Sequence, residues 1–326
     1  MKILVTGGAG FIGSHLVERL LQEGHQVLVL DDLSTGSRDF SNQVISNKNY
    51  TFIPGSVNHR KLVEVSMDGC DAVFHLAAML GVKNTVENPL KVIEGNIDGT
   101  RNVLEVAYQK GIKVIFTSTS EVYGKNTVLP FKEDADRVLG ATSTHRWCYA
   151  TAKALDEHLC FAYKEKGLPV TVIRYFNTYG PRQTSSEYGG VVSRFIKAAL
   201  NHQPIEVYGT GTQSRCFTFV GDAVSGTTAT LSQKANGFIF NIGTDRTITI
   251  QELAEMIRRL AGSSSKIIRV PYEEAYGPGY EDMQARMPDL ERAKFILGYE
   301  PKTGLEDGLR TTIEWYRQNI IGNNGG

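Results

Sequence analysis

A glycine-rich turn near the start of the chain most constrains its fold. Gly7, Gly10 and Gly13 follow the apolar run Ile3–Val5 and precede a segment whose apolar residues have helical spacing. Glycines at this spacing allow a tight turn and let the backbone approach a pyrophosphate group, which then lies at the N-terminus of the next helix. Because the glycines stand between a strand and a helix, they predict a dinucleotide-binding βαβ unit.

Short β-branched runs alternate with helical patterns through the first half of the chain. The expected strands lie at Ile3–Val5, Val27–Leu30, Phe52–Ile53, Ala72–Phe74, Val114–Phe116 and Val170–Ile173. The expected helices include His15–Gln22, Leu90–Lys110 and Arg146–Lys166. Strands that are apolar along their whole length and joined by helices indicate a parallel sheet covered on both faces. The predicted fold class is therefore α/β, with a Rossmann doubly wound parallel sheet.

The pattern changes after about residue 177, where Gly and Pro become more frequent. We expect a dinucleotide-binding domain over residues 1–176 and a smaller C-terminal lobe over 177–326 that binds the substrate. The helices expected from residue 177 onward lie at Val191–Leu200, Ala223–Leu231, Ile250–Leu260 and Leu305–Tyr316. A late apolar run, Phe238–Ile242, predicts a strand near 237–243 that returns to the main sheet, so the lobe is partly interleaved with the first domain.

Composition excludes several kinds of partner. Lys and Arg number 35 and Asp and Glu also number 35, so the formal net charge is zero. Nucleic acids and anionic membranes both favour a positive surface, so neither is expected to be the main partner. The four cysteines are scattered without metal-binding spacing, which predicts free thiols and no metal site. The sequence shows neither a signal peptide nor a membrane span, which predicts a cytoplasmic protein.

Two acidic residues at the end of the second expected strand indicate which dinucleotide binds. Asp31 follows Val27–Leu30, and Asp32 is adjacent and could share its role. A carboxylate at this place accepts hydrogen bonds from the ribose hydroxyls and repels a 2′-phosphate. The cofactor is therefore predicted to be NAD and not NADP.

A tyrosine and a lysine in a later helix have the spacing of a catalytic pair. Tyr149 and Lys153 are four residues apart, so a helix places them on one face, one turn from each other. A free tyrosine has a pKa of about 10, but a nearby ammonium group and a cationic nicotinamide favour the phenolate. The pair is therefore predicted to deprotonate an alcohol, with Thr119 at the end of the strand before it.

Together these motifs resemble the extended short-chain dehydrogenase/reductase family, also described as the NAD-dependent epimerase/dehydratase family. The resemblance rests on the glycine turn, Thr119, the pair of Tyr149 and Lys153, and the segment Arg174–Arg182, and it covers essentially the whole chain. It implies a nucleotide-sugar substrate, tightly bound NAD and a homodimer that packs through two helices of each subunit.

The resemblance also implies which residues contact each ligand. Besides the glycines, Asp31, Asp32, Tyr149 and Lys153, the residues that would border NAD are Phe11, Ile12, Leu76, Ala77 and Asn96. The residues that would bind a UDP-sugar are Asn177, Val191, Tyr208 and Arg215. Asn177 and Arg215 would contact the diphosphate, and Tyr208 would lie near the base. Ser56 departs from the family, which often has Asp there, so that contact with the adenine stays open.

Two further stretches resemble the UDP-glucuronate decarboxylases within this family. Thr119, Ser120 and Glu121 match the decarboxylase pattern, whereas epimerases usually carry small or neutral residues after the threonine. The stretch Gln284–Asp289 resembles a decarboxylase segment in which an arginine, here Arg286, reaches the active site. Arg146, by contrast, is interpreted only as a support for the loop before the helix.

The resulting hypothesis is a decarboxylase that acts on UDP-glucuronate or on a related uronate such as its 2-acetamido analogue. Tyr149, Thr119 and Lys153 would serve the oxidation at C4, after which the sugar is a β-keto acid that loses carbon dioxide readily. Arg286 would bind the C6 carboxylate or help to protonate C5, with Ser120 and Glu121 beside C5 and C6. The alternatives are a UDP-sugar 4-epimerase, then a nucleotide-sugar 4,6-dehydratase; a non-catalytic NAD sensor is disfavoured because Tyr149 and Lys153 are intact.

Overall fold

The computed structural model describes residues 1–79, 85, 87–183, 190–276 and 282–321. Its centre is a parallel seven-stranded sheet with the strand order β3-β2-β1-β4-β5-β6-β11. The strands are β1 (Lys2–Thr6), β2 (Gln26–Asp31), β3 (Tyr50–Pro54), β4 (Ala72–His75), β5 (Lys113–Thr119), β6 (Val170–Tyr175) and β11 (Ile239–Ile242). The predicted α/β fold class with a doubly wound sheet is confirmed.

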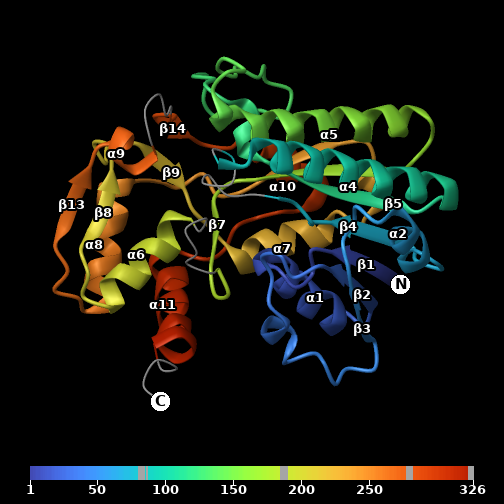
Figure 1. Cartoon of the computed structure of the whole chain (residues 1–326), viewed down its shortest axis with the longest axis horizontal. Coiled ribbons are helices and arrows are strands. Elements are labelled where there is room, and N and C mark those ends of the chain that lie inside the picture. The colour runs from blue at the N-terminus through green and yellow to red at the C-terminus, as the bar shows by residue number, and fades with distance from the viewer. Residues whose placement is uncertain (80–84, 86, 184–189, 277–281, 322–326) are drawn as a thin grey trace.

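Helices cover both faces of this sheet (Figure 1). One face packs against α1 (Phe11–Gln22), α7 (Val220–Ala229) and α10 (Glu291–Leu297). The other face packs against α2 (Arg60–Ser66), α4 (Pro89–Lys110) and α5 (Cys148–Glu165). Burial on both sides explains why the central strands are apolar along their length and could be found in the sequence.

The direction in which strands are added reverses at β1. From β1 the chain builds β2 and β3 on one side of the sheet, and β4, β5 and β6 follow on the other side. The crevice outside the carboxyl ends of the strands at such a reversal is the usual ligand site of an open α/β sheet. The glycine turn after β1 and the polar end of β5 both lie at this edge.

The smaller lobe, at the left of Figure 1, has its own apolar core. Its helices are α6 (Val191–Leu200), α8 (Ile250–Ala261), α9 (Tyr272–Tyr276) and α11 (Leu305–Tyr316). Short strands form three small sheets: β7 (Thr178–Tyr179) with β10 (Thr218–Phe219), β8 (Ile205–Tyr208) with β13 (Ile267–Val270), and β9 (Ser214–Cys216) between β12 (Thr247–Thr249) and β14 (Ala285–Arg286).

The two parts of the chain are interleaved. Between β10 and β12 the chain returns to the main sheet, where it forms α7 and then β11, which pairs with β6 in parallel. The strand expected at Phe238–Ile242 is therefore found, and it starts one residue later. The chain thus passes between the main sheet and the lobe more than once, and these connections hold the lobe next to the carboxyl edge of the sheet.

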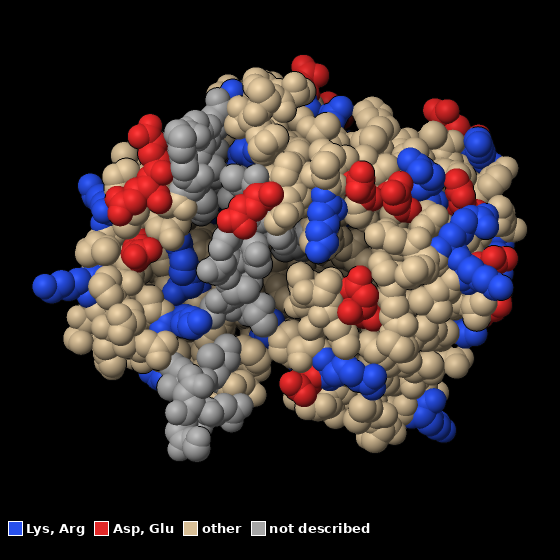
Figure 2. Space-filling model, viewed as in Figure 1, with Lys and Arg blue, Asp and Glu red and all other residues tan. Residues whose placement is uncertain are grey.

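The surface seen in Figure 2 carries charges of both signs, interspersed over both parts of the molecule. None of the helices in the described residues has both the length and the apolar character needed to cross a membrane. The same residues contain no cluster of His, Cys, Asp or Glu that could hold a metal ion.

Candidate active site

A cavity of about 430 Å³ lies at the carboxyl edge of the main sheet and reaches into the smaller lobe. It brings together most of the site residues expected from the sequence. Those that line it are Gly7, Gly10, Phe11, Ile12, Gly13, Asp31, Asp32, Leu76, Ala77, Thr119, Ser120, Glu121, Tyr149, Lys153, Asn177 and Arg286. Val191, Tyr208 and Arg215 instead line a neighbouring cavity.

The glycine turn has room for backbone only. A Cβ atom at Gly7 would lie 2.7 Å from the Ala77 nitrogen, and Gly7 also has a φ of +71°. A Cβ atom at Gly13 would lie 2.1 Å from the Gly7 carbonyl oxygen. The absence of side chains exposes the N-terminus of α1 to the cavity, where a pyrophosphate is favoured by the helix dipole and the free N–H groups.

Asp31 holds the glycine turn as well as facing the cavity. Its carboxylate accepts hydrogen bonds from the Ala9 nitrogen at 2.9 Å and the Leu33 nitrogen at 2.8 Å. Burial raises the pKa of Asp31, and these two N–H groups oppose the shift. Each carboxylate oxygen can accept a further hydrogen bond, so the side chain can both order the turn and bind ribose hydroxyls.

Asn96 lies behind the cavity wall. Its side-chain nitrogen donates to the carbonyl oxygens of Met79 and Val92, and its side-chain oxygen accepts from the Met79 nitrogen. It therefore orders the backbone after β4 at Met79, which does line the cavity. Its contribution to a cofactor site would be indirect.

Tyr149 and Lys153 lie on α5 directly beneath the end of β5. The buried Lys153 ammonium donates to the Thr117 carbonyl oxygen at 2.9 Å and lies over the Phe116 ring. Burial and the Glu121 carboxylate raise the pKa of Tyr149 above its usual value. The lowering expected from the sequence therefore does not come from this chain alone, because desolvation and the carboxylates of Glu121 and Asp156 all disfavour the phenolate.

The stretch after β5 forms one turn of 3₁₀ helix, Ser120–Tyr123, capped by Thr119. The Thr119 hydroxyl accepts a hydrogen bond from the Glu121 nitrogen at 3.2 Å. This turn directs Glu121 into the cavity, where its Oε2 accepts a 2.6 Å hydrogen bond from Arg146. Arg146 and Arg286 overcome the effect of burial and lower the pKa of Glu121 to about 2.

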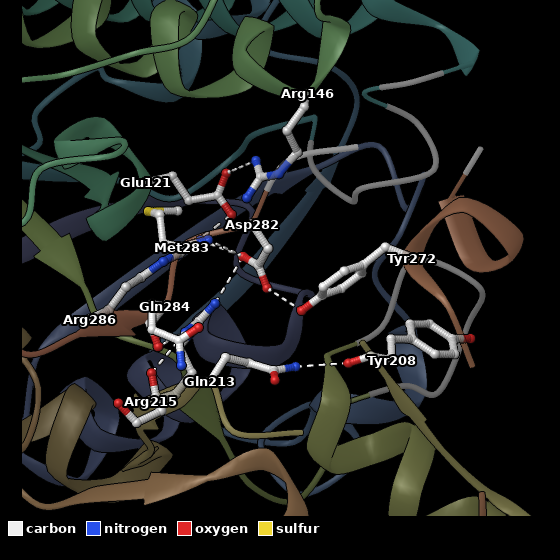
Figure 3. Close-up of polar contacts among 11 residues, drawn as sticks. Glu121, Arg146, Tyr208, Gln213, Arg215, Tyr272, Asp282, Met283, Gln284 and Arg286 are labelled. Carbon is white, nitrogen blue, oxygen red and sulfur yellow. Dashed lines mark hydrogen bonds and ion pairs between the residues drawn. The ribbon is translucent and has the colours of Figure 1, made fainter. Parts of the chain in front are cut away.

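Arg286 reaches the cavity because β14 pairs with β9. In this parallel pair Arg286 lies opposite Arg215, so two guanidinium groups stand side by side. Asp282 lies between them, 2.9 Å from Arg215 and 4.0 Å from Arg286, as Figure 3 shows. Burial lowers the pKa of Arg286 to about 10; the Glu121 carboxylate opposes this shift, and the positive charges of Arg215 and Arg146 add to it.

The neighbouring cavity, of about 170 Å³, shares three residues with the first: Glu121, Asn177 and Arg286. In the second cavity the Arg194 guanidinium stacks 3.6 Å from the centre of the Tyr208 ring. Arg215, Gln213 and Tyr272 complete a basic and aromatic wall. A nucleotide diphosphate with its base fits this chemistry, since arginines bind phosphate oxygens and aromatic rings stack on a base.

Sequence reasoning missed the part that Arg146 plays. The side chain is only 4 % exposed, and it donates a hydrogen bond directly to Glu121, a contact that support of the loop before the helix does not include. The available signal was its place three residues before Tyr149, which puts it at the entrance to α5. Arg194, Tyr272 and Asp282 were also missed, because no local pattern marks them.

The comparisons with known proteins agree with this geometry. Residues 3–243 match the sequence model of the NAD dependent epimerase/dehydratase family. The chain is 48 % identical over 317 residues to a UDP-N-acetyl-alpha-D-glucosaminuronate decarboxylase from Bacillus cytotoxicus, covering 97 % of this chain and 98 % of that protein. It is 37 % identical over 320 residues to UDP-glucuronic acid decarboxylase 1 from Xenopus tropicalis, covering 98 % of this chain and 73 % of that one.

A solved structure extends the comparison to bound ligands. UDP-glucuronic acid 4-epimerase from Bacillus cereus, in complex with UDP-glucuronic acid and NAD, superposes with a TM-score of 0.88 at 29 % identity. The alignment covers 98 % of this chain and 99 % of that one. A fold of this kind therefore holds both a nucleotide sugar and NAD in that protein.

Proposed function

Because this chain belongs to the NAD-dependent epimerase/dehydratase family, we propose that it is an NAD-dependent UDP-uronate decarboxylase. We further propose that the uronate carries a 2-acetamido group, as the name of the Bacillus cytotoxicus relative states for that protein. The observation that carries the proposal is buried Arg286, which lines the same cavity as Tyr149. A planar guanidinium binds a carboxylate through two parallel hydrogen bonds, and the C6 carboxylate distinguishes a uronate from a neutral sugar.

The residues around the glycine turn fit NAD. Gly7 and Gly13 leave only backbone at the start of α1, which suits the pyrophosphate, and Asp31 suits the ribose hydroxyls. When bound, NAD accepts the hydride from C4 of the sugar and later returns it. The oxidised nicotinamide ring is also the additional positive charge that the Tyr149 phenolate requires.

Tyr149 takes the proton from the C4 hydroxyl in the first step. Lys153, one helical turn away, supports the phenolate, and the Thr119 hydroxyl donates a hydrogen bond to the same sugar oxygen. Carbon dioxide then leaves C5, and the electron pair of the broken C5–C6 bond passes into the C4 enolate, which Thr119 and Tyr149 stabilise. A proton from solvent adds to C5, hydride returns to C4, and Tyr149 gives its proton back to the C4 oxygen.

Glu121 is expected not to be the direct donor of the proton to C5. Its pKa of about 2 keeps it a carboxylate at neutral pH. A fixed negative charge near the substrate carboxylate disfavours the charged ground state and favours its loss as neutral carbon dioxide. Ser120, which is buried beside it, completes this wall of the cavity.

A 4-epimerase is the second candidate, because the Bacillus cereus uronate epimerase has the same fold. The experiment is to supply purified protein and NAD with UDP-glucuronate or its 2-acetamido analogue and to measure carbon dioxide. We expect kcat/KM to be at least roughly 10-fold higher with the 2-acetamido sugar, because recognition of one additional substituent usually changes kcat/KM by at least this factor. Equal values would remove the proposed sugar preference, and a C4 epimer without carbon dioxide would favour the epimerase.

Asp31 is expected to set the cofactor preference. Replacing it with serine removes the charge that repels a 2′-phosphate, and also one acceptor for the Ala9 and Leu33 nitrogens. We expect the Kd for NAD to rise by roughly 10-fold and the ratio of NADP to NAD affinity to rise further. Fluorescence titration measures both, and Asp32→Ser shows whether the adjacent carboxylate shares this role. An unchanged ratio in Asp31→Ser would assign the discrimination elsewhere.

We propose a cytoplasmic homodimer that forms through α4 and α5. These helices pack against each other and lie side by side in Figure 1. Leu90, Tyr108 and Leu155 expose large apolar groups on them, with Leu155 44 % exposed. Leu155→Glu is expected to shift the mass measured by light scattering from twice the chain mass to the chain mass. A wild-type protein that is monomeric at micromolar concentration would contradict the dimer.

A further inference from the structure

Among the described residues, Arg146 is the arginine that forms a hydrogen bond with Glu121. It belongs to a 3₁₀ turn, His145–Trp147, that leads directly into α5 and Tyr149. Its guanidinium lies over the Trp147 ring, 5.4 Å from the ring centre, and Nη1 donates to Glu121 Oε2 at 2.6 Å. The stacked ring and the burial fix the guanidinium in place, so this ion pair is a built contact and not a mobile surface pair.

The second arginine beside Glu121 is much less engaged. Arg286 Nη1 lies 3.7 Å from Glu121 Oε1, and Arg286 Nη2 lies 4.0 Å from Asp282, which are both beyond hydrogen-bond distance. Within the described residues Arg286 makes no hydrogen bond, and its buried Nε has no partner there. Figure 3 shows the two guanidinium groups on opposite sides of the Glu121 carboxylate.

We propose that Arg146 is a positioning residue that holds Glu121 in a close ion pair, so that Arg286, only loosely paired with Glu121 at 3.7 Å, keeps its hydrogen-bond donors available for the C6 carboxylate of the substrate. This inference rests on the proposed function, because it concerns the same uronate site. Without Arg146, Glu121 and the substrate carboxylate would compete for one guanidinium. With Arg146, each carboxylate has its own arginine.

The charges around the site support this division. Arg146, Arg286 and Arg215 act on Glu121 from three elements, the turn before α5, β14 and β9, and Tyr149 faces it from α5. Asp282 pairs with Arg215 at 2.9 Å, and in the described structure Arg286 has only the looser pairs with Glu121 at 3.7 Å and Asp282 at 4.0 Å and no carboxylate at hydrogen-bond distance. A substrate carboxylate would supply one, and a neutral hexose would not.

The ionisation of Glu121 gives the proposal a pH signature. Burial raises its pKa, and Arg146 is the largest of the contributions that lower it, with the net result at about 2. The carboxylate therefore persists across the working pH range, and the wild-type profile of kcat/KM has no acid limb from Glu121. Removing Arg146 lets the pKa of Glu121 rise, so an acid limb enters the measurable range and activity falls as pH decreases.

The test compares Arg146→Met with Arg146→Lys and with Arg258→Met, an exposed arginine on α8 that serves as the control. For Arg146→Met we expect UDP-glucuronate to bind roughly 30-fold or more weakly, as for truncation of one partner in a buried charge pair, with UDP-glucose binding within about twofold of wild type. We also expect the pH profile of kcat/KM to gain an acid limb that the wild type lacks. Arg146→Lys should retain much of the uronate affinity and the wild-type profile.

Other outcomes would overturn the assignment. Equal losses for UDP-glucuronate and UDP-glucose, or a uniform fall in activity without a new acid limb, would mean that Arg146 only supports the fold. If Arg146→Met does not fold, the discrimination between the two sugars in Arg146→Lys and Arg146→Gln decides. Carbon dioxide release by the wild type is scored separately, so the decarboxylase assignment can fail while the binding comparison still tests Arg146.

Discussion

A Tyr149→Phe protein is expected to turn over UDP-uronate roughly 10²- to 10⁴-fold more slowly, which is the usual contribution of a positioned acid–base group. Phenylalanine keeps the ring packed at the start of α5 and removes only the hydroxyl that takes the C4 proton. Binding of NAD and of the nucleotide sugar should therefore change little. Stopped-flow absorbance would show that reduction of NAD slows in the same proportion, because C4 oxidation is the first step.

Tyr163 provides the matched control for this substitution. It lies on the same helix, and its ring packs against Tyr108 with the centres 5.6 Å apart, away from the cavity. Tyr163→Phe should retain full activity. If Tyr149→Phe kept more than a tenth of wild-type turnover, the base would have to be another group.

Replacing Arg286 with methionine is expected to lower kcat/KM for UDP-uronate by roughly 10²- to 10³-fold. A loss of this size is typical when a carboxylate loses its buried charged partner. The side chain is buried and makes no hydrogen bond within the described structure, so an apolar replacement of similar length should leave the fold intact. Binding of UDP-glucose, which has no carboxylate, should change far less.

Isothermal titration with UDP-glucuronate and UDP-glucose separates these two effects. Arg286→Lys should recover part of the activity, since lysine keeps the charge but cannot form the bidentate pair. Arg310→Met is the control, because Arg310 forms an exposed ion pair with Glu306 on α11 and lines neither of the two cavities described above. A similar loss of affinity for both sugars would assign Arg286 to the nucleotide and not to the uronate.

The features that could be predicted from the sequence either depend on neighbouring residues in the chain or belong to strands that are buried on both faces of the sheet. The strands of the main sheet are apolar along their length because helices cover both faces, and the glycine turn and Asp31 follow such strands directly. Tyr149 and Lys153 share one helix, so their spacing alone places them together. Ser120 and Glu121 follow β5 without a break. All of these residues line one cavity.

The features that could not be predicted depend on contacts between distant segments. The pairing of β14 with β9 sets Arg286 beside Arg215, and both strands are too short to show a period of two. The direction of the Arg146 side chain depends on the turn before α5 and on Trp147. The pKa of Tyr149 likewise reflects desolvation in the folded chain and the nearby Glu121 carboxylate, which its spacing from Lys153 does not reveal.

The most direct test of the central claim is NMR of the reaction in D₂O with UDP-uronate labelled with ¹³C at C6. Oxidation at C4, loss of carbon dioxide and re-reduction predict that the label appears in carbon dioxide and bicarbonate. They also predict a UDP-pentose product that carries one deuterium at C5 and keeps its original hydrogen at C4. A product that retains labelled C6 and differs only in the configuration at C4 would contradict the decarboxylase and identify an epimerase.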